Sequence, residues 1–228
     1  MERAFVYGDL VFESMRFEAG QIPFISYHLD RLKAAAKCLK MEFPNQLNET
    51  AVLEQANQLI QNADESFKIR LVLYRDASGF YLPNQNQAKW ELAIFPLSQR
   101  EKPMPIKMGI YTDIQKQYNQ LSSFKTGNAL LYVMASIWAK ENGFDDAFII
   151  NEQGRVCEAT SSNFCWFDGT NWFTPPLTEA CVAGIGRRIL LENEQVIEKI
   201  CYLNDLKAAQ KIYLTNAIHL QTAAVLVE

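Results

Sequence analysis

Two side chains in the middle of the chain are of types that suit a cofactor reaction. Lys125 stands among small residues that leave room for a ligand, and Glu158 follows 33 positions later between apolar neighbours. An amine whose pKa its surroundings lower can attack a carbonyl. A carboxylate in an apolar setting can keep a ring nitrogen protonated, which turns the ring into an electron sink. The ordinary alternatives are a solvated surface lysine and an exposed strand acid.

These two residues need particular elements to position them. We expect a helix over 128–142, directly after Lys125, because apolar residues recur there at helical spacing and Gly143 can end it. The inward side of this helix is predicted to carry Leu131, Met134, Ile137 and Trp138. Glu158 ends a predicted strand over 155–158. A strand and a loop thus have to bring the lysine and the acid to one ligand.

Three further segments could bind a phosphate group. Gly184, Ile185 and Gly186 begin a predicted helix, where free N–H groups and the positive end of the helix dipole favour an anion. Thr215 ends a predicted strand over 211–215 and offers a hydroxyl. Arg31, on a predicted helix, could add a charge-assisted hydrogen bond. Taken singly, each is also typical of an ordinary helix start, turn or surface residue.

The remaining pattern predicts a mixed α and β protein. We expect a turn feeding a strand over 5–17, a hairpin at Gly20 with a return strand over 21–24, and a helix from Ser26, its N-cap, to about Lys40. A short helix is predicted to be capped by Asn204. The other expected elements are a helix over 48–62 and strands over 68–74, 90–96, 106–111, 147–150, 163–167 and 172–174.

Length and composition narrow the function further. The 228 residues suffice for one large domain or two small ones, and the polar, proline-containing run at 99–104 is the expected linker between domains over 1–98 and 105–228. A net charge of −4 favours no nucleic-acid partner. No apolar run could span a bilayer and no signal-peptide core is present, so we expect a cytoplasmic protein. The five cysteines and two histidines show no metal-ligand spacing, which predicts free thiols and no metal site.

Six motifs in order then identify a family. They are YGDLVFE at 7–13, HLDRL at 28–32, Lys125, GRVCE with Ser-Asn at 154–163, TPP at 174–176 and GIGR at 184–187. Each motif is weak alone, but the ordered set resembles the class IV aminotransferases, the fold-type IV enzymes of pyridoxal 5'-phosphate (PLP). That family includes branched-chain and D-amino-acid aminotransferases and 4-amino-4-deoxychorismate lyase. The resemblance runs from Phe5 to about Ala217.

The resemblance implies a fold and a set of roles. The implied fold is an α+β arrangement of a small N-terminal α/β domain and a larger pseudo-barrel domain, with PLP in the cleft between them, in a homodimer. Lys125 would bind the cofactor covalently and move the substrate proton, and Glu158 would pair with the ring nitrogen. The implied phosphate ligands are Arg31, the amides of Ile185 and Gly186, and Thr215. Further implied contacts are Asn163 to the cofactor and Ser14, Asn216 and Ala217 to an amino-acid-like substrate.

The sequence departs from the family pattern at three places. Leu10 replaces the glycine usual in the first motif. Gly186 stands where a Thr or Ser hydroxyl often reaches the phosphate, so Thr215 is expected to compensate. The chain begins close to the first motif, without the strand pair that usually precedes it, so we expect a smaller first sheet and a more open substrate cleft.

Several details favour one branch of the family. Branched-chain enzymes usually carry a tyrosine five residues after the lysine, where this chain has Leu130, although Thr126-Gly127-Asn128 is similar to their pattern. Ser14 and the turn at 215–217 are similar to the lyase branch. Our leading hypothesis is therefore a 4-amino-4-deoxychorismate lyase. The alternatives are an aminotransferase of branched-chain or D-amino acids and, from another class, a non-catalytic protein that binds PLP or a small acid.

Overall fold

The chain forms two compact units. The structure is a computed structural model that describes residues 2–60, 65–97 and 105–227. One unit comprises residues 1–99 together with 124–128, and the other comprises 100–123 and 129–228. The expected linker at 99–104 lies outside the described residues. Residues 124–128 contain Lys125 and pack with the first unit, although they follow the start of the second unit in the sequence.

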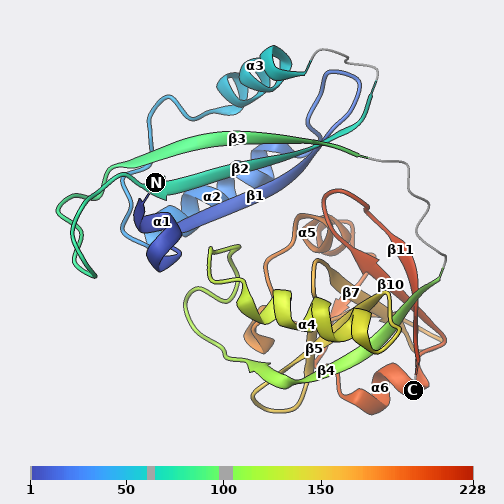
Figure 1. Cartoon of the computed structure of the whole chain (residues 1–228). Coiled ribbons are helices and arrows are strands. Elements are labelled where there is room, and N and C mark those ends of the chain that lie inside the picture. The colour runs from blue at the N-terminus through green and yellow to red at the C-terminus, as the bar shows by residue number, and fades with distance from the viewer. Residues whose placement is uncertain (1, 61–64, 98–104, 228) are drawn as a thin grey trace. The chain divides into compact units, whose positions relative to one another are not determined.

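The first unit consists of a three-stranded antiparallel sheet and the helices that contact its strands (Figure 1). The strands pair in the order β1-β2-β3. Leu10 of β1 lies opposite Tyr74 of β2, and Phe67 of β2 lies opposite Pro96 of β3. Its elements are α1 (Glu2–Tyr7), β1 (Leu10–Phe17), α2 (Ile25–Cys38), α3 (Glu49–Leu59), β2 (Phe67–Arg75) and β3 (Ala88–Pro96).

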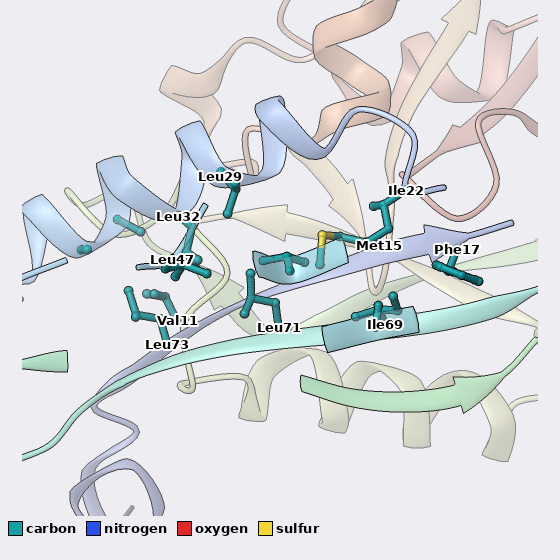
Figure 2. Packing of buried hydrophobic residues seen from close by; sticks show 14 of the residues in the cluster. Val11, Met15, Phe17, Ile22, Leu29, Leu32, Leu47, Ile69, Leu71 and Leu73 are labelled. Carbon is teal, nitrogen blue, oxygen red and sulfur yellow. The ribbon is translucent and has the colours of Figure 1, made fainter. Parts of the chain in front are cut away.

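Alternation along the strands builds the core of this unit. Val11, Met15 and Phe17 of β1 point to the same face as Ile69, Leu71 and Leu73 of β2, because successive side chains on a strand point to opposite faces. Leu29 and Leu32 of α2 cover them (Figure 2). The other face of the sheet carries Phe12, Ser14 and Arg70, which are only half-buried.

The second unit is built on an eight-stranded mixed sheet in the order β6-β5-β4-β11-β10-β7-β8-β9. The sheet curls, so that β6 at one edge also contacts β7 from the far half, and α4 packs on β4 and β5 (Figure 1). Its elements are β4 (Ile106–Lys116), α4 (Leu130–Glu141), β5 (Asp146–Asn151), β6 (Val156–Ala159), β7 (Asn163–Phe167), β8 (Trp172–Thr174), a 3-10 turn (Leu177–Glu179), α5 (Ile185–Glu192), β9 (Ile197–Glu198), α6 (Leu203–Ala208), β10 (Lys211–Thr215) and β11 (Thr222–Leu226).

Most expected elements are confirmed, and the errors have local causes. The predicted cap at Ser26 is wrong: the N-cap is Phe24, two residues earlier, whose φ of 58° makes the turn before α2. No strand forms over 21–24, where only a bridge between Glu18 and Gln21 closes the hairpin turn. The Asn204 cap is wrong because α6 begins at Leu203, with the Asp205 carboxylate accepting from the Tyr202 N–H at 2.8 Å. The sequence patterns did not predict α1 and β11.

The inward face of α4 also differs from the prediction. Met134 and Ile137 are exposed, together with Leu130 and Val133. The buried side is instead formed by Ala135 and Ala139, with Leu131, Tyr132 and Trp138 beside them. Small alanines let the helix approach the sheet closely, and Leu131 and Trp138 face inward as predicted, whereas Met134 and Ile137 do not. This orientation of the helix carries Tyr132 toward Glu158.

No helix among the described residues is long and apolar enough to cross a membrane. Those residues also contain no group of three or more His, Cys, Asp or Glu side chains placed to hold a metal ion. None of the five cysteines forms a disulfide, and four of them are buried.

Candidate active site

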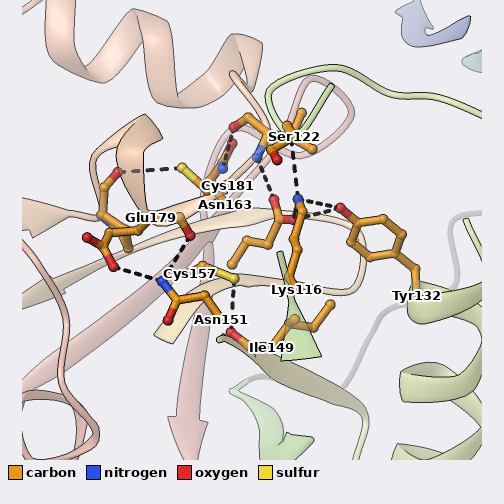
Figure 3. A network of polar contacts seen from close by, with 12 residues as sticks. Lys116, Ser122, Tyr132, Ile149, Asn151, Cys157, Asn163, Glu179 and Cys181 are labelled. Atoms are coloured by element: carbon orange, nitrogen blue, oxygen red, sulfur yellow. Dashed lines mark hydrogen bonds and ion pairs between the residues drawn. The ribbon is translucent and has the colours of Figure 1, made fainter. Parts of the chain in front are cut away.

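Glu158 is the centre of a buried polar network in the second unit. The residue is 2% exposed on β6. Its Oε1 accepts a hydrogen bond from Tyr132 at 2.7 Å and contacts the Lys116 ammonium, and its Oε2 accepts from the Val182 N–H at 2.8 Å. Figure 3 shows Tyr132 reaching into this network from α4. The cationic partner and the two further donors compensate the charge of a buried carboxylate.

Lys116 and Tyr132 are the residues that the sequence interpretation missed. Lys116 is the last residue of β4 and is buried there, although the polar run before it is typical of an exposed strand end. Tyr132 is not among the α4 residues predicted to face inward. Burial, followed by the Glu158 charge, raises the pKa of Tyr132 far above its usual value, so its hydroxyl stays protonated and donates. No spacing in the sequence connects either residue with Glu158.

The segment 182–186 connects the surroundings of Glu158 with the start of α5. Its first residue, Val182, donates to Glu158, and Ile185 begins the helix. Asn163 holds the segment in place, because its Nδ2 donates to the Val182 carbonyl at 2.8 Å. A Cβ on Gly184 would lie 1.8 Å from Asn163 Oδ1, so only glycine fits at position 184. The contacts of Asn163 therefore show a residue that shapes the loop, and its contact with a cofactor stays a prediction.

The start of α5 has the features of a phosphate cradle. Ile185 and Gly186 are its first two residues, and the first N–H groups of a helix have no partner within the helix. Beside them lies Thr215 at the end of β10, which is 1% exposed and whose Oγ1 has no hydrogen-bond partner among the described residues. A buried hydroxyl without a partner is costly. An oxyanion at this helix start would satisfy it.

Arg187 and Asn216, near the same end of the site, have hydrogen-bond partners within the protein. Arg187 donates to the Pro175 carbonyl at 2.9 Å and pairs with Glu198. The Asn216 side chain closes its own turn, since its Oδ1 accepts from the N–H groups of Ile218 and His219 and its Nδ2 donates to Ser162 at 2.9 Å. Ala217 lies inside that turn and is half-buried. The substrate roles of Asn216 and Ala217 stay predictions.

Arg31 and Lys125 lie in the first unit. Arg31 is held by the buried Glu13, with its Nε donating to Oε1 at 2.7 Å, and His28 Nδ1 lies 2.6 Å from the other oxygen. Burial raises the pKa of Glu13, but the Arg31 charge and the hydrogen bonds from His28 and Arg31 outweigh it and lower the pKa to about 2. Glu13 thus fixes Arg31 in one orientation, and His28 joins α2 to the sheet.

Lys125 belongs to a short segment docked along β1. Its carbonyl accepts from the Phe12 N–H at 2.8 Å, and Gly127 donates to the Leu10 carbonyl at 3.0 Å. The Lys125 ammonium lies 5.1 Å from the centre of the Phe12 ring, on the sheet face that also carries Ser14. An aromatic ring attracts a cation without neutralising it. This backbone docking fixes the position of Lys125 relative to β1.

Two cations of this sheet face lie on β2. Lys68 and Arg70 are half-buried on β2, and Arg70 lies directly opposite Ser14. The Arg70 guanidinium lies 5.1 Å from the Phe12 ring centre, and its buried Nε has no hydrogen-bond partner in the described chain. Burial and the nearby Arg70 charge lower the pKa of Lys68. This face is therefore suited to binding an anion.

The site in the second unit fits PLP. The Glu158 carboxylate can accept from a ring N–H, the helix start with the unpartnered Thr215 hydroxyl can bind a phosphate, and segment 182–186 joins the two. These features define a protein with a place for a phosphorylated cofactor that has a basic ring nitrogen. The comparisons agree. The family model "Amino-transferase class IV" matches residues 10–225, and the chain belongs to this family of PLP-dependent enzymes.

Relatives within the family carry different activities in their names. The chain is 27% identical over 229 residues to an aminodeoxychorismate lyase of Vibrio harveyi, covering 95% of this chain and 82% of the relative. It is also 27% identical over 227 residues to a protein of Methanocaldococcus jannaschii provisionally named a branched-chain-amino-acid aminotransferase, covering 94% of this chain and 77% of the relative. Sequence identity thus gives the family and does not separate the two activities.

The fold is that of the solved class IV aminotransferases. A Brucella abortus aminotransferase bound to PLP superposes with a TM-score of 0.85 at 22% identity, covering 98% of this chain and 83% of that one. This agreement confirms the expected fold class: α+β, with a small first domain and a larger domain built on a curled sheet.

Proposed function

We propose that this chain is a PLP-dependent lyase that cleaves 4-amino-4-deoxychorismate into 4-aminobenzoate and pyruvate. The observation that carries the proposal is the pair Lys68 and Arg70. Neither side chain has a hydrogen-bonding or ion-pairing partner among the described residues, and both lie on the sheet face that bears Phe12 and Lys125. Half-buried cations without counter-ions favour an anionic ligand.

The charge of the substrate separates the two activities of the family. The chorismate derivative carries two carboxylates and one amine. Leucine carries a single carboxylate and an apolar side chain, for which a surface with two unpaired cations is a poor partner. Ser14, opposite Arg70, adds a hydroxyl to the same surface. A substrate with two carboxylates therefore suits this sheet face better.

The proposed roles are those that the family resemblance implies. Bound PLP supplies the electron sink. Lys125 binds the cofactor and moves the substrate proton, Glu158 accepts from the ring nitrogen, and the phosphate is held by the start of α5, Thr215 and Arg31. The Lys116 ammonium already has three acceptors, namely Glu158, Tyr132 and the Ser122 carbonyl, so its donors are used up. This supports Lys125 as the attachment site.

Two experiments test this proposal. Borohydride reduction of the PLP-loaded protein should fix the cofactor to the peptide containing Lys125, and mass spectrometry distinguishes that peptide from the one containing Lys116. Lys125→Ala should abolish both the fixation and the turnover; if the reduced cofactor still attaches elsewhere in Lys125→Ala, the lysine assignment is wrong. The wild type should release pyruvate from 4-amino-4-deoxychorismate without any 2-oxo acid.

The role of the cations is tested by kinetics. Arg70→Met and Lys68→Met should raise KM for the chorismate derivative by roughly ten- to a hundredfold, because a hydrogen bond to a charged group contributes about 1.5–3 kcal/mol. Lys89→Met is the control, since Lys89 is exposed on the neighbouring strand and already paired with Asp76. An unchanged KM in both variants would remove the argument for a substrate with two carboxylates.

An aminotransferase of branched-chain or D-amino acids is the second candidate, supported by the similarity to the Methanocaldococcus jannaschii protein. It predicts turnover of leucine or D-alanine that depends on a 2-oxo acid, with none on the chorismate derivative. A non-catalytic PLP-binding protein would turn over neither. We further propose that the chain is a cytoplasmic homodimer, as the family resemblance implies, and light scattering after size-exclusion chromatography tests the dimer.

A further inference from the structure

Lys116 is a buried lysine whose contacts are all internal. Its side chain is about 10% exposed, and its ammonium donates to Tyr132 at 2.7 Å, to the Ser122 carbonyl at 3.4 Å and to Glu158 (Figure 3). An ammonium has three donors, and these three acceptors use them all. Lys116 therefore cannot also bind a ligand. Its influence on a ligand has to pass through Glu158.

The contacts of Glu158 are unequally divided between its two oxygens. Oε1 accepts from both Lys116 and Tyr132, whereas Oε2 accepts only from the Val182 N–H. An ionised carboxylate can accept about four hydrogen bonds, two at each oxygen. One acceptor position is left, and it is on Oε2. Lys116 and Tyr132 thus determine which oxygen faces a further donor.

We propose that Lys116 is a positioning residue that supplies the counter-charge of Glu158, leaves only Oε2 for the ring N–H of the cofactor, and weakens the hold of Glu158 on that proton. This inference rests on the role of Glu158 in the proposed function. The ammonium and a protonated ring nitrogen are both cations that share one carboxylate. The Lys116 ammonium weakens the attraction between Glu158 and the ring N–H, and the ring N–H weakens the attraction between Glu158 and Lys116. Lys116 therefore sets how strongly the ring nitrogen keeps its proton, and a protonated ring is the stronger electron sink.

Lys116 is the charged partner of Glu158. Besides Tyr132, the thiols of Cys157 and Cys181 interact electrostatically with Glu158. Burial raises the pKa of both thiols, that of Cys181 to about 12, so they are neutral. Of the groups that donate to Glu158, only Lys116 carries a charge.

Lys116→Met separates this role from a merely structural one. Without the ammonium, the buried carboxylate lacks a counter-charge, and the Tm of the cofactor-free protein should fall by about 10 °C. A protonated ring nitrogen then becomes the only cation on Glu158, so the rise in Tm on adding PLP should exceed that of the wild type by about 5 °C. With ¹⁵N-labelled PLP, the ring-nitrogen shift should stay that of the protonated form to higher pH than in the wild type.

Three variants complete the test. Lys116→Arg keeps the charge and should keep the wild-type rise in Tm. Lys116→Met combined with Glu158→Gln removes both charges. This double variant should recover the Tm of the cofactor-free protein and lose the additional rise in Tm on adding PLP. Arg75→Met breaks an ion pair with Asp9 in the first unit. It should lower the Tm with PLP and the Tm without PLP by the same amount.

Two different outcomes separate a failure of this inference from a failure of the proposed function. If Lys116→Met lowers the Tm with and without PLP by the same amount and leaves the ring-nitrogen shift unchanged, Lys116 is only structural and the inference fails. The proposed function still stands in that case if the wild type binds PLP through Lys125 and releases pyruvate. If the wild type forms no lysine–PLP bond, the proposed function fails first.

Discussion

The Thr215 hydroxyl lies in the space that a side chain on residue 186 would need. A Cβ built on Gly186 would be 2.2 Å from Thr215 Oγ1, far closer than two such atoms can approach. The two positions therefore exclude each other: either residue 186 has a side chain or residue 215 places a hydroxyl there. A chain with glycine at position 186 can therefore still offer a hydroxyl at the start of α5.

Thr215→Val should have opposite effects on stability and on cofactor binding. Valine has the shape of threonine, and the lost hydroxyl has no partner in the described chain, so the stability of the cofactor-free protein should stay equal or rise by about 1 kcal/mol. The Kd of PLP should increase about tenfold or more, because a hydrogen bond to a charged phosphate is lost. Urea unfolding and PLP titration measure the two quantities.

Thr174→Val is the matched control. Thr174 is as deeply buried, but its hydroxyl donates to the Phe164 carbonyl at 2.8 Å. This variant should lose about 1 kcal/mol of stability and keep the wild-type affinity for PLP. If Thr215→Val loses stability to the same extent and binds PLP normally, the Thr215 hydroxyl is not a phosphate ligand.

The hydroxyl should be movable from residue 215 to residue 186. Gly186→Ser alone should destabilise the protein by about 1–3 kcal/mol, because the new Cβ collides with Thr215. Adding Thr215→Ala removes the colliding oxygen, so the double variant should recover most of the stability and bind PLP more tightly than Thr215→Ala. Additive losses in the double variant would show that the two side chains do not share this space.

Glu13 should make the stability of the protein depend on pH in the acid range. Its pKa is lowered from 4.5 to about 2, so its contribution is complete above pH 4.5 and is lost as the pH falls toward 2. The loss should be roughly 3 kcal/mol. Urea unfolding between pH 5 and 2 measures this loss as a decrease in the free energy of unfolding. Glu13→Gln should lack the decrease, whereas Glu18→Gln, at an exposed position, should retain it. A wild-type decrease in Glu13→Gln would contradict the assignment.

The cysteines should differ sharply in reactivity. Burial raises the pKa of Cys157, Cys165, Cys181 and Cys201, to about 12 for Cys165 and Cys181, and a thiol reacts as its thiolate. Cys38 is the only one of the five that is not buried. A thiol reagent at pH 8 should therefore titrate one cysteine in the native protein and five after unfolding. Rapid reaction of a second thiol would show that the core of the second unit opens.

The sequence by itself determined the family, the fold class and most strands and helices. It could do so because glycine turns, the alternation of apolar residues and the ordered motifs are local properties of the chain. Lys125, Glu158 and the start of α5 stand in those motifs and needed no coordinates to be singled out.

Only the tertiary structure decided which side chains surround them. Lys116 meets Glu158 across 42 positions of the chain, and Tyr132 joins them because α4 packs on the sheet through Ala135 and Ala139 and leaves Met134 and Ile137 exposed. Gly186 and Thr215 exclude each other through a contact between a helix start and a strand end. Such contacts depend on how closely the elements pack and on the rotation of each helix, which no short-range pattern in the sequence records.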